Sequence, residues 1–422
     1  MKKHMLFRFS LYGFLKNQQY FEPFLVLAFM DKGLSFFTIG LLIAWRELMI
    51  NVLEIPSGAI ADLFGRRQAM VLAFTGYIIS FLTFALAEHL PLLFMAMTLF
   101  AVGDSFRSGT HKSLIFNWLR LNNREQDRLR IYGFTRSWSK FGSAVSVLFA
   151  GIFVFTTQSY TMIFYLSALP YLANIVNLLS YPEEIDPLPA RRRSPRQVWQ
   201  HIRAVFVEAF TRKPLRTLLL EAMGYEGTFR ATKDYLQPVL KTSALSLAAL
   251  SPALASLNEV QQSAILVGAV YFLLNILSAF GSRNAWRLSE SSGGEEKAAT
   301  WLWSITLPIY ALIAVAAYLQ WYLPVILAFS LLFILQNFWR PLLVSRIDSF
   351  GKAEHGATLL SVESQLRRIG TMIMAPAIGY AVDLVHGQGQ GGSVWPVGLF
   401  GAVIVLSFII YRSLARPAHG EN

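Results

Sequence analysis

Ionisable side chains occur at helical spacing inside long apolar stretches of this 422-residue chain. In one stretch Asp104, Arg107 and His111 follow at i, i+3 and i+7, which places all three on one side of a helix. A charge in hydrocarbon is costly, so such a group pairs with another charge, lines a wet cavity or serves a function. We interpret Asp104 and Arg107 as residues that bind a substrate or couple to protons. The alternative is an ion pair that only stabilises the helix.

Three other apolar stretches carry polar groups near their middles. Their candidate substrate-binding or coupling residues are Lys16, Gln19 and Glu22, then Glu226, Arg230, Lys233 and Asp234, and finally Gln336 and Arg340. A buried Glu22 could load and release a proton, and a salt bridge with Lys16 is an equal alternative. His111 could instead hydrogen-bond a neighbouring helix. Glu363, Arg367 and Arg368 could line a cavity or contact a loop, and the sequence does not separate these roles.

Several kinds of chemistry are not expected. No second histidine or carboxylate stands beside His111 at ligand spacing, so we predict no metal site. The chain has no cysteine, which excludes disulfides, thiol catalysis and thiolate metal sites. It also has no phosphate-binding Walker loop, so we expect no ATP-driven step, no cofactor and no enzyme activity.

The elements that must hold these residues are membrane helices. Hydrophobic residues make up 54% of the chain and charged residues 15%, and the mean hydropathy is +0.45. Runs of about 20 apolar residues recur, which predicts an all-α membrane protein with twelve transmembrane helices. The first run is interrupted by Lys16 and Glu22 and lacks a cleavage site, so we interpret it as a span and not as a signal peptide. The predicted spans are 7–30, 36–62, 69–88, 91–118, 131–156, 159–181, 215–240, 262–282, 299–319, 322–346, 357–384 and 395–412.

Lysine and arginine cluster in alternate connections between the spans, and the other side carries only Lys32 and Lys241. The positive-inside rule then places both termini in the cytoplasm, and we expect the cytoplasmic (inner) membrane of a bacterium. The same asymmetry explains the net charge of +12 without nucleic acid as a partner. The predicted domains are a six-helix bundle at 1–181, a cytoplasmic central loop with an amphipathic segment at 182–214, and a second six-helix bundle at 215–422.

The charges also repeat along the chain. The third, sixth, ninth and twelfth spans carry none apart from Glu88 and Arg412 at the ends of two of them, which predicts four triplets of helices whose first members face inward and whose third members face lipid. Gly142 and Gly151 are nine residues apart in the fifth span, as are Gly370 and Gly379 in the eleventh. Internal repeats of this kind are typical of secondary transporters.

The loop between the second and third spans carries a motif, GAIADLFGRR. It resembles the signature loop of the major facilitator superfamily, roughly G-x-x-x-D-x-x-G-R-R, and the matching residues are Gly58, Asp62, Gly65, Arg66 and Arg67. The resemblance implies two pseudo-symmetric six-helix bundles that give alternating access to a central site lined by spans one, four, seven and ten. It further implies that these five loop residues form a conformational latch; ordinary positive-inside charge on a tight turn is the alternative.

We therefore expect a monomeric secondary active transporter that moves a small organic solute across the lipid bilayer, coupled to protons or another ion. Basic groups slightly outnumber acids among the candidate residues, which favours a solute with an anionic group. The main alternative is a polyspecific drug/proton antiporter, although the fifth span lacks the Gly-Pro ending of such antiporters. A membrane-embedded transferase and a non-transporting receptor are further alternatives.

Overall fold

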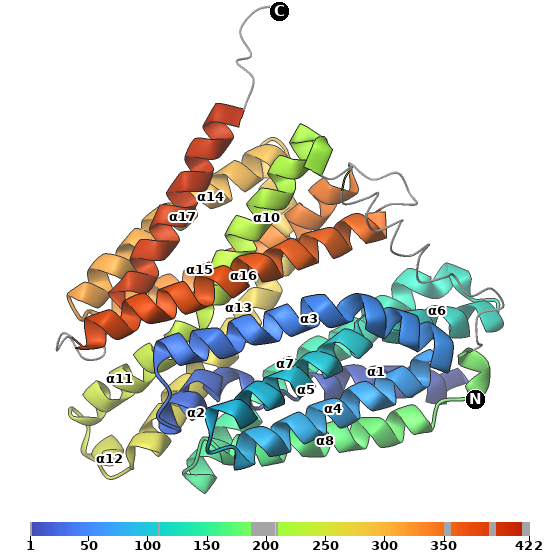
Figure 1. Cartoon of the computed structure of the whole chain (residues 1–422), viewed down its shortest axis with the longest axis horizontal. Helices are drawn as coiled ribbons and strands as arrows, with labels where there is room; N and C mark the ends of the chain where they lie inside the picture. Colours follow the sequence, from blue (N-terminus) through green and yellow to red (C-terminus); the bar gives the residue numbers. More distant parts are fainter. Residues whose placement is uncertain are drawn as a thin grey trace, which may run out of the picture. The chain divides into compact units, whose positions relative to one another are not determined.

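The computed structural model describes residues 2–108, 110–186, 207, 210–349, 356–387 and 394–415. Within these ranges every regular element is a helix and no strand occurs, so the predicted all-α membrane fold class is confirmed (Figure 1). Nine helical stretches of the described residues are long and apolar enough to cross a membrane. The predicted amphipathic segment of the central loop lies almost wholly outside the described residues.

Each half of the chain contributes eight α-helices to the described structure. Those of the first half are α1 (Lys2–Lys16), α2 (Leu25–Asp31), α3 (Phe36–Phe64), α4 (Arg66–Leu86), α5 (Leu90–Arg107), α6 (Thr110–Leu121), α7 (Arg128–Thr157) and α8 (Met162–Leu179). Those of the second half are α10 (Lys213–Thr232), α11 (Leu236–Ala248), α12 (Pro252–Ala255), α13 (Glu259–Ser291), α14 (Glu295–Tyr318), α15 (Tyr322–Asp348), α16 (Gly356–Gly387) and α17 (Trp395–Ala415). The predicted second, ninth and tenth spans agree with α3, α14 and α15 to about one helical turn.

Two predicted spans are wrong as continuous helices. The chain leaves the helix after Lys16 and resumes α-helix only at Leu25, and a 3-10 turn at Lys233–Tyr235 separates α10 from α11. Each interruption includes the residue four positions before a proline, Pro23 in one case and Pro238 in the other. A proline lacks the N–H that this earlier carbonyl would accept, and its ring crowds the same carbonyl. Both breaks therefore have the same local cause.

The fourth predicted span is also divided. α5 ends at Arg107, Ser108 takes an extended ψ of 121°, and α6 begins at Thr110. The expectation that Asp104, Arg107 and His111 share one side of one helix is therefore wrong, because His111 belongs to the next helix. The break lies next to the charged residues Asp104 and Arg107.

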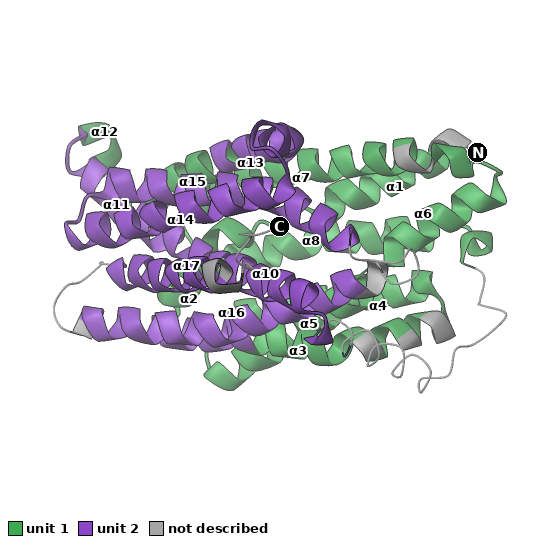
Figure 2. Cartoon of the chain, turned by 90° about the horizontal axis from the view of Figure 1, so that it is seen from above, with its two compact units in different colours: residues 1–32, 45–195, 252–272 green, residues 33–44, 196–251, 273–422 purple. Residues whose placement is uncertain are grey.

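The chain divides into two compact units (Figure 2). Unit 1 comprises residues 1–32, 45–195 and 252–272, and unit 2 comprises residues 33–44, 196–251 and 273–422. In unit 1, α4 contacts both α5 and α8, while α1 contacts α7 and α8. In unit 2, α10 packs on α16, and α14 packs on α15 and α17. The predicted boundary at 182–214 stays a prediction.

The repeated glycine pairs allow corresponding close contacts. A Cβ at Gly142 of α7 would lie 2.6 Å from the backbone of α1, and one at Gly370 of α16 would lie 2.9 Å from the backbone of α10. The second glycine of each pair meets another helix: Gly151 approaches α13 within unit 1, and Gly379 approaches α3 within unit 2. The spacing of nine residues thus marks two equivalent helix contacts in each unit.

The third predicted span, which forms most of α4, differs from the prediction that every third span faces lipid. α4 does expose Leu72, Ile79 and Leu86 on one side. Its other side is buried, and Tyr77 there reaches Asp104 on α5. The third span is therefore not only a lipid-facing helix, because it supplies a polar group to the interior of unit 1.

Candidate functional site

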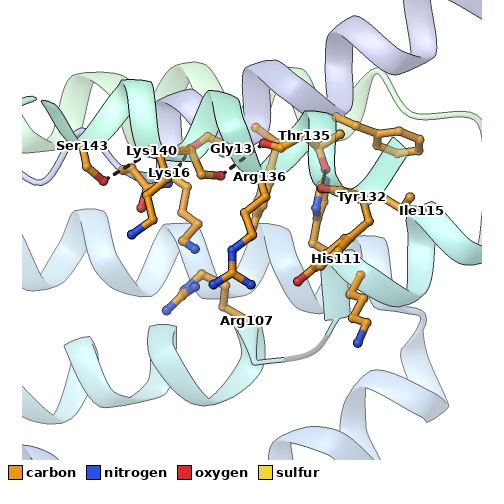
Figure 3. A pocket seen from close by; sticks show the side chains of 15 residues that line it. Gly13, Lys16, Arg107, His111, Ile115, Tyr132, Thr135, Arg136, Lys140 and Ser143 are labelled. Carbon is orange, nitrogen blue, oxygen red and sulfur yellow. Dashed lines mark hydrogen bonds between the residues drawn. The ribbon is translucent and has the colours of Figure 1, made fainter. Parts of the chain in front are cut away.

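Unit 1 contains a cavity of about 400 Å³ lined by residues of α1, α5, α6 and α7 and by the residue that follows α1 (Figure 3). Two of the polar groups come from helix ends: Lys16 is the last residue of α1, and Arg107 is the last residue of α5. α7 supplies one wall with Tyr132, Arg136 and Lys140. Interrupted helices at such positions expose side chains and backbone ends to an interior space.

The cavity is strongly basic. Its lining includes five cationic side chains and, among the described residues, no carboxylate; the five are Lys16, Arg107, Lys112, Arg136 and Lys140. Figure 3 shows the charged ends of Lys16, Arg107, Arg136 and Lys140 directed into the same space. Lys112 lies 5.5 Å from the ring centres of Phe116 and Tyr132. Lys16, Arg136 and Lys140 form no salt bridge with any described residue.

Arg107 is the one cation of the cavity that a carboxylate neutralises within the described residues. Its Nη2 donates to Oδ1 of Asp104 at 2.7 Å, and its Nε donates to the hydroxyl of Tyr77 at 2.9 Å. The Tyr77 hydroxyl in turn donates to the same Asp104 oxygen. These bonds fix the direction of the guanidinium. Tyr77 was not among the predicted site residues, because an uncharged tyrosine in an apolar span gives no signal of its own.

His111 is buried at the edge of the cavity. Its ring stacks on Tyr12 with centroids 3.6 Å apart, and Nε2 lies 3.1 Å from the hydroxyl of Tyr181. This packing agrees with the alternative that His111 bonds a neighbouring helix. Gln19 lies in the break after α1 and does not line the cavity. Glu22 is exposed at the start of a 3-10 turn and not buried, and its role as a proton carrier stays a prediction.

Unit 2 holds a different arrangement, in which acids and bases alternate. Glu226 of α10 receives Nη1 of Arg340 at 3.0 Å and Nη1 of Arg367 at 2.5 Å. Glu363 of α16 receives the same two nitrogens at 2.9 and 3.3 Å. Two carboxylates and two guanidiniums thus join α10, α15 and α16. We call these four residues the unit 2 network.

Two atoms of this network are incompletely bonded. Glu363 is fully buried, and its Oε2 has no hydrogen-bond partner among the described residues, nor has Nε of Arg367. The side chain of Arg340 is 37% exposed, whereas Glu226 and Arg367 are buried. Glu363 and Arg367 were named from the sequence only with an undecided role, because their partners lie on other helices.

The remaining candidates of unit 2 lie around the helix break. Lys233 pairs with its neighbour Asp234 at 2.6 Å, and both are half-buried. Arg230 is half-buried one turn beyond Glu226 and adds positive charge near it. Gln336 of α15 buries its Oε1 without a hydrogen-bond partner among the described residues. Their roles in substrate binding stay predictions.

The predicted latch residues meet acids from the segment that follows α8. The backbone N–H groups of Arg66 and Arg67 donate to the two carboxylate oxygens of Asp186 at 3.0 and 2.8 Å. The Arg67 side chain pairs with Glu183 at 3.0 Å. Gly65 precedes them with φ of +98°, a conformation that favours glycine. Asp186 therefore occupies the positive N-terminus of α4.

The other two predicted latch residues are Gly58 and Asp62. Gly58 is exposed, and a Cβ added there would meet nothing within 4 Å. The side chain of Asp62 lies outside the described residues. The latch role of the motif stays a prediction. Among the described residues, no group of three His, Asp or Glu side chains could hold a metal ion.

Comparisons with known proteins agree with this architecture. The sequence model of the Major Facilitator Superfamily matches residues 17–375. An uncharacterized MFS-type transporter of Bacillus subtilis (strain 168), YxaM, is 29% identical over 93 residues, which span 22% of this chain and only 23% of that protein.

Solved structures share the fold at low sequence identity. The nucleoside transporter NupG superposes with a TM-score of 0.77 at 13% identity, over 96% of this chain and 98% of that one. A D-xylose-proton symporter gives 0.63 at 14% identity, over 96% of each chain. The resemblance predicted from the loop motif is thereby confirmed, and the chain belongs to the Major Facilitator Superfamily.

Proposed function

We propose that this protein is a secondary active transporter that carries a small organic solute with an anionic group across the membrane by alternating access. The observation that supports this most directly is the charge of the unit 1 cavity. Three cations, Lys16, Arg136 and Lys140, lack a carboxylate partner there among the described residues. A cation that is partly removed from water needs a compensating negative charge, and a bound anion supplies it.

The lining also suits the organic part of such a solute. Phe9, Tyr12 and Tyr132 present aromatic surface, and Asn17, Ser139 and Ser143 present hydrogen-bonding groups. A volume of about 400 Å³ is within the usual range of small-molecule pockets. A polyspecific site for hydrophobic cations is disfavoured, because these basic groups would repel its substrates.

We further propose that transport is coupled to protons, in the inner membrane of a bacterium, with both termini in the cytoplasm. Buried carboxylates in unit 2 give the chain groups that can exchange a proton during the cycle. The distribution of lysine and arginine supports the orientation. The protein then acts as a monomeric transporter and not as an enzyme.

The test uses the purified full chain in phosphatidylcholine vesicles that contain a pH-reporting dye. Succinate and phenyl phosphate are offered with their neutral counterparts, succinamide and phenol, under an imposed proton gradient. We expect uptake of at least one anion, together with a change of internal pH, and no carrier-dependent uptake of its neutral counterpart. Equal carrier-dependent movement of the anionic and neutral members would overturn the proposal. Lys297→Gln, which changes an exposed lysine of α14, is the control that should transport like the wild type.

A further inference from the structure

We propose that Glu363 is the proton-binding residue of a coupling site formed by the unit 2 network. Its use in transport rests on the proposed function, but proton binding at Glu363 is a property of unit 2 and can be tested without a solute. The site differs from the sequence expectations, which named Glu22 as a possible proton carrier, with a salt bridge to Lys16 as an equal alternative, and Asp104 and Arg107 as possible coupling residues. Glu22 is exposed, whereas Glu363 is fully buried.

The two oxygens of the Glu363 carboxylate are bonded unevenly. Oε1 accepts from Arg340 at 2.9 Å and from Arg367 at 3.3 Å, whereas Oε2 is buried with no partner among the described residues. A buried ionised oxygen without a donor carries a desolvation cost. A proton that binds Oε2 forms the neutral acid and removes that charge. The vacant oxygen therefore marks the position where a proton is accepted.

A second buried ion pair in unit 2 serves for comparison, because its hydrogen bonding is complete. Arg346 is buried and contacts Glu221 at 3.0 Å and Glu296 at 2.7 Å. No atom of these three residues is among the buried side-chain atoms that lack a partner. Burial is similar at Glu221 and Glu363, so burial alone does not distinguish them. The incomplete hydrogen bonding of Oε2 does distinguish Glu363 from Glu221, and Glu221 is therefore a matched control.

Arg340 is the residue of the unit 2 network that can leave it. Its Nη1 bridges Glu226 and Glu363, yet more than a third of its side chain is exposed. When Arg340 turns to water or to another anion, Glu363 loses the nearer of its two guanidiniums. A buried carboxylate that loses its counter-charge binds a proton from the aqueous phase. Protonation changes the formal charge of the four residues from zero to +1.

This link has a direction. Since binding equilibria are reciprocal, a state of the cycle in which Arg340 leaves Glu363 favours protonation of Glu363, and protonation favours that state. Coupling to transport requires that the anion-loaded state is the one in which Arg340 has left, and proton and anion then travel together. The binding step transfers one proton from water to Oε2 and breaks the Arg340–Glu363 contact, with no other reactant.

Charged groups of α10, α15 and α16 surround Glu363. α10 contributes Glu226 and Arg230, α15 contributes Arg340, and α16 itself contributes Arg367 and Arg368. The described part of α17 from Trp395 to Tyr411 has no charged side chain. The positive groups outnumber the acids around Glu363, and Arg340 is the partly exposed member of the unit 2 network. Release of Arg340 removes one of these positive charges from Glu363.

The test is pH-difference infrared spectroscopy of the full chain in phosphatidylcholine nanodiscs, which detects the C=O stretch of protonated carboxyl groups. We expect a band that grows as the pH falls in the wild type and that is lost in Glu363→Gln. The control Glu221→Gln should keep it. A band that persists in Glu363→Gln, or that disappears equally in Glu221→Gln, would overturn the assignment.

A second variant covers the case that Glu363→Gln does not fold. Arg340→Gln keeps Glu363 and removes its exposed partner, so we expect more protonated carboxyl at neutral pH than in the wild type. An unchanged amount would contradict the role of Arg340.

The transport measurement separates this inference from the proposed function. For an anion that the vesicle assay identifies, Glu363→Gln should retain exchange of internal for external solute within about twofold, because exchange needs no net proton movement. Accumulation driven by a pH gradient should fall to the level of empty vesicles. Accumulation that persists overturns the proton site. If no anion is transported at all, the proposed function fails, and the infrared band still decides whether Glu363 binds a proton.

Discussion

The two units treat buried charge in opposite ways. In the unit 1 cavity, cations exceed the carboxylates that could neutralise them, and Lys16, Arg136 and Lys140 form no salt bridge with a described residue. In the unit 2 network, two carboxylates meet two guanidiniums. Unit 1 therefore has an unmet requirement for negative charge, which a ligand can satisfy, whereas unit 2 satisfies its own.

The difference separates two tasks that one charged site could not perform equally well. An unbalanced cluster attracts a solute, but it gains little from internal bonds. A balanced network ties helices together and responds when one partner leaves. Removal of a cation should therefore weaken binding in unit 1 and folding in unit 2. The following variants test that contrast, from the largest expected effect to the smallest.

Arg367→Gln should destabilise the protein most. It leaves Glu226 and Glu363 buried without one of their two guanidiniums, and the loss of one partner of a buried ion pair costs about 3–5 kcal/mol. Thermal unfolding in detergent should show a clearly lower midpoint. Adding Glu226→Gln should recover part of the loss, since one of the uncompensated charges is then removed. A midpoint equal to that of the wild type would show that the network does not stabilise unit 2.

Lys16→Gln should have the reverse profile. The lysine has no salt-bridge partner in the described chain, so its removal should not lower the unfolding midpoint. The affinity for a transported anion should fall about tenfold to hundredfold, because a hydrogen bond to a charged group contributes about 1.5–3 kcal/mol. Isothermal titration calorimetry measures the affinity, with Lys297→Gln as the control. A variant that unfolds early and still binds the anion normally would reverse the contrast between the units.

Tyr77→Phe tests how Arg107 is held. The variant removes the hydroxyl that bonds both Asp104 and Arg107 and leaves the ring in place. A hydrogen bond of this kind is worth about 1 kcal/mol, so anion affinity should fall about fivefold. Tyr165→Phe, which changes an exposed tyrosine of α8, should have no effect on the same titration. An equal loss in both variants would mean that the Tyr77 hydroxyl does not position Arg107.

Asp186→Asn should give the smallest effect. Here unit 1 does balance a charge, since the carboxylate sits on the N-terminus of α4. Favourable charge at a helix end contributes about 0.3–1 kcal/mol, so the unfolding midpoint should fall slightly, and less at high salt. Glu184→Gln, an exposed neighbouring carboxylate, is the control. If the two variants behave alike, the contact with α4 contributes nothing.

Much of the fold follows from hydrophobic runs that the sequence shows directly. The ninth to twelfth predicted spans agree closely with α14 to α17, because each is a long apolar segment with polar ends. The breaks in the first and seventh spans were not predicted as breaks. In the first span the lost helical bond lies four residues before Pro23, and Pro238 acts in the same way on Asp234.

The sequence predicted only part of the candidate site. Lys16 and Arg107 stood out because they interrupt apolar sequence. Arg136 and Lys140 lie toward the start of α7, where basic residues are already explained by the positive-inside rule. Pairings between helices, such as that of Arg340 with Glu363, leave no local pattern. The sequence therefore identified charges but could not tell satisfied ones from unsatisfied ones.

The central claim is that the unbalanced cations of unit 1 bind an anion. The most direct measurement is the calorimetric titration of succinate and phenyl phosphate, with succinamide and phenol, into wild-type protein and into the triple variant Lys16→Gln, Arg136→Gln, Lys140→Gln. We predict that at least one anion binds the wild type, that its neutral counterpart does not, and that the triple variant loses this binding while it remains folded. Anion binding that survives in the triple variant, or a neutral counterpart that binds as tightly, would contradict the account.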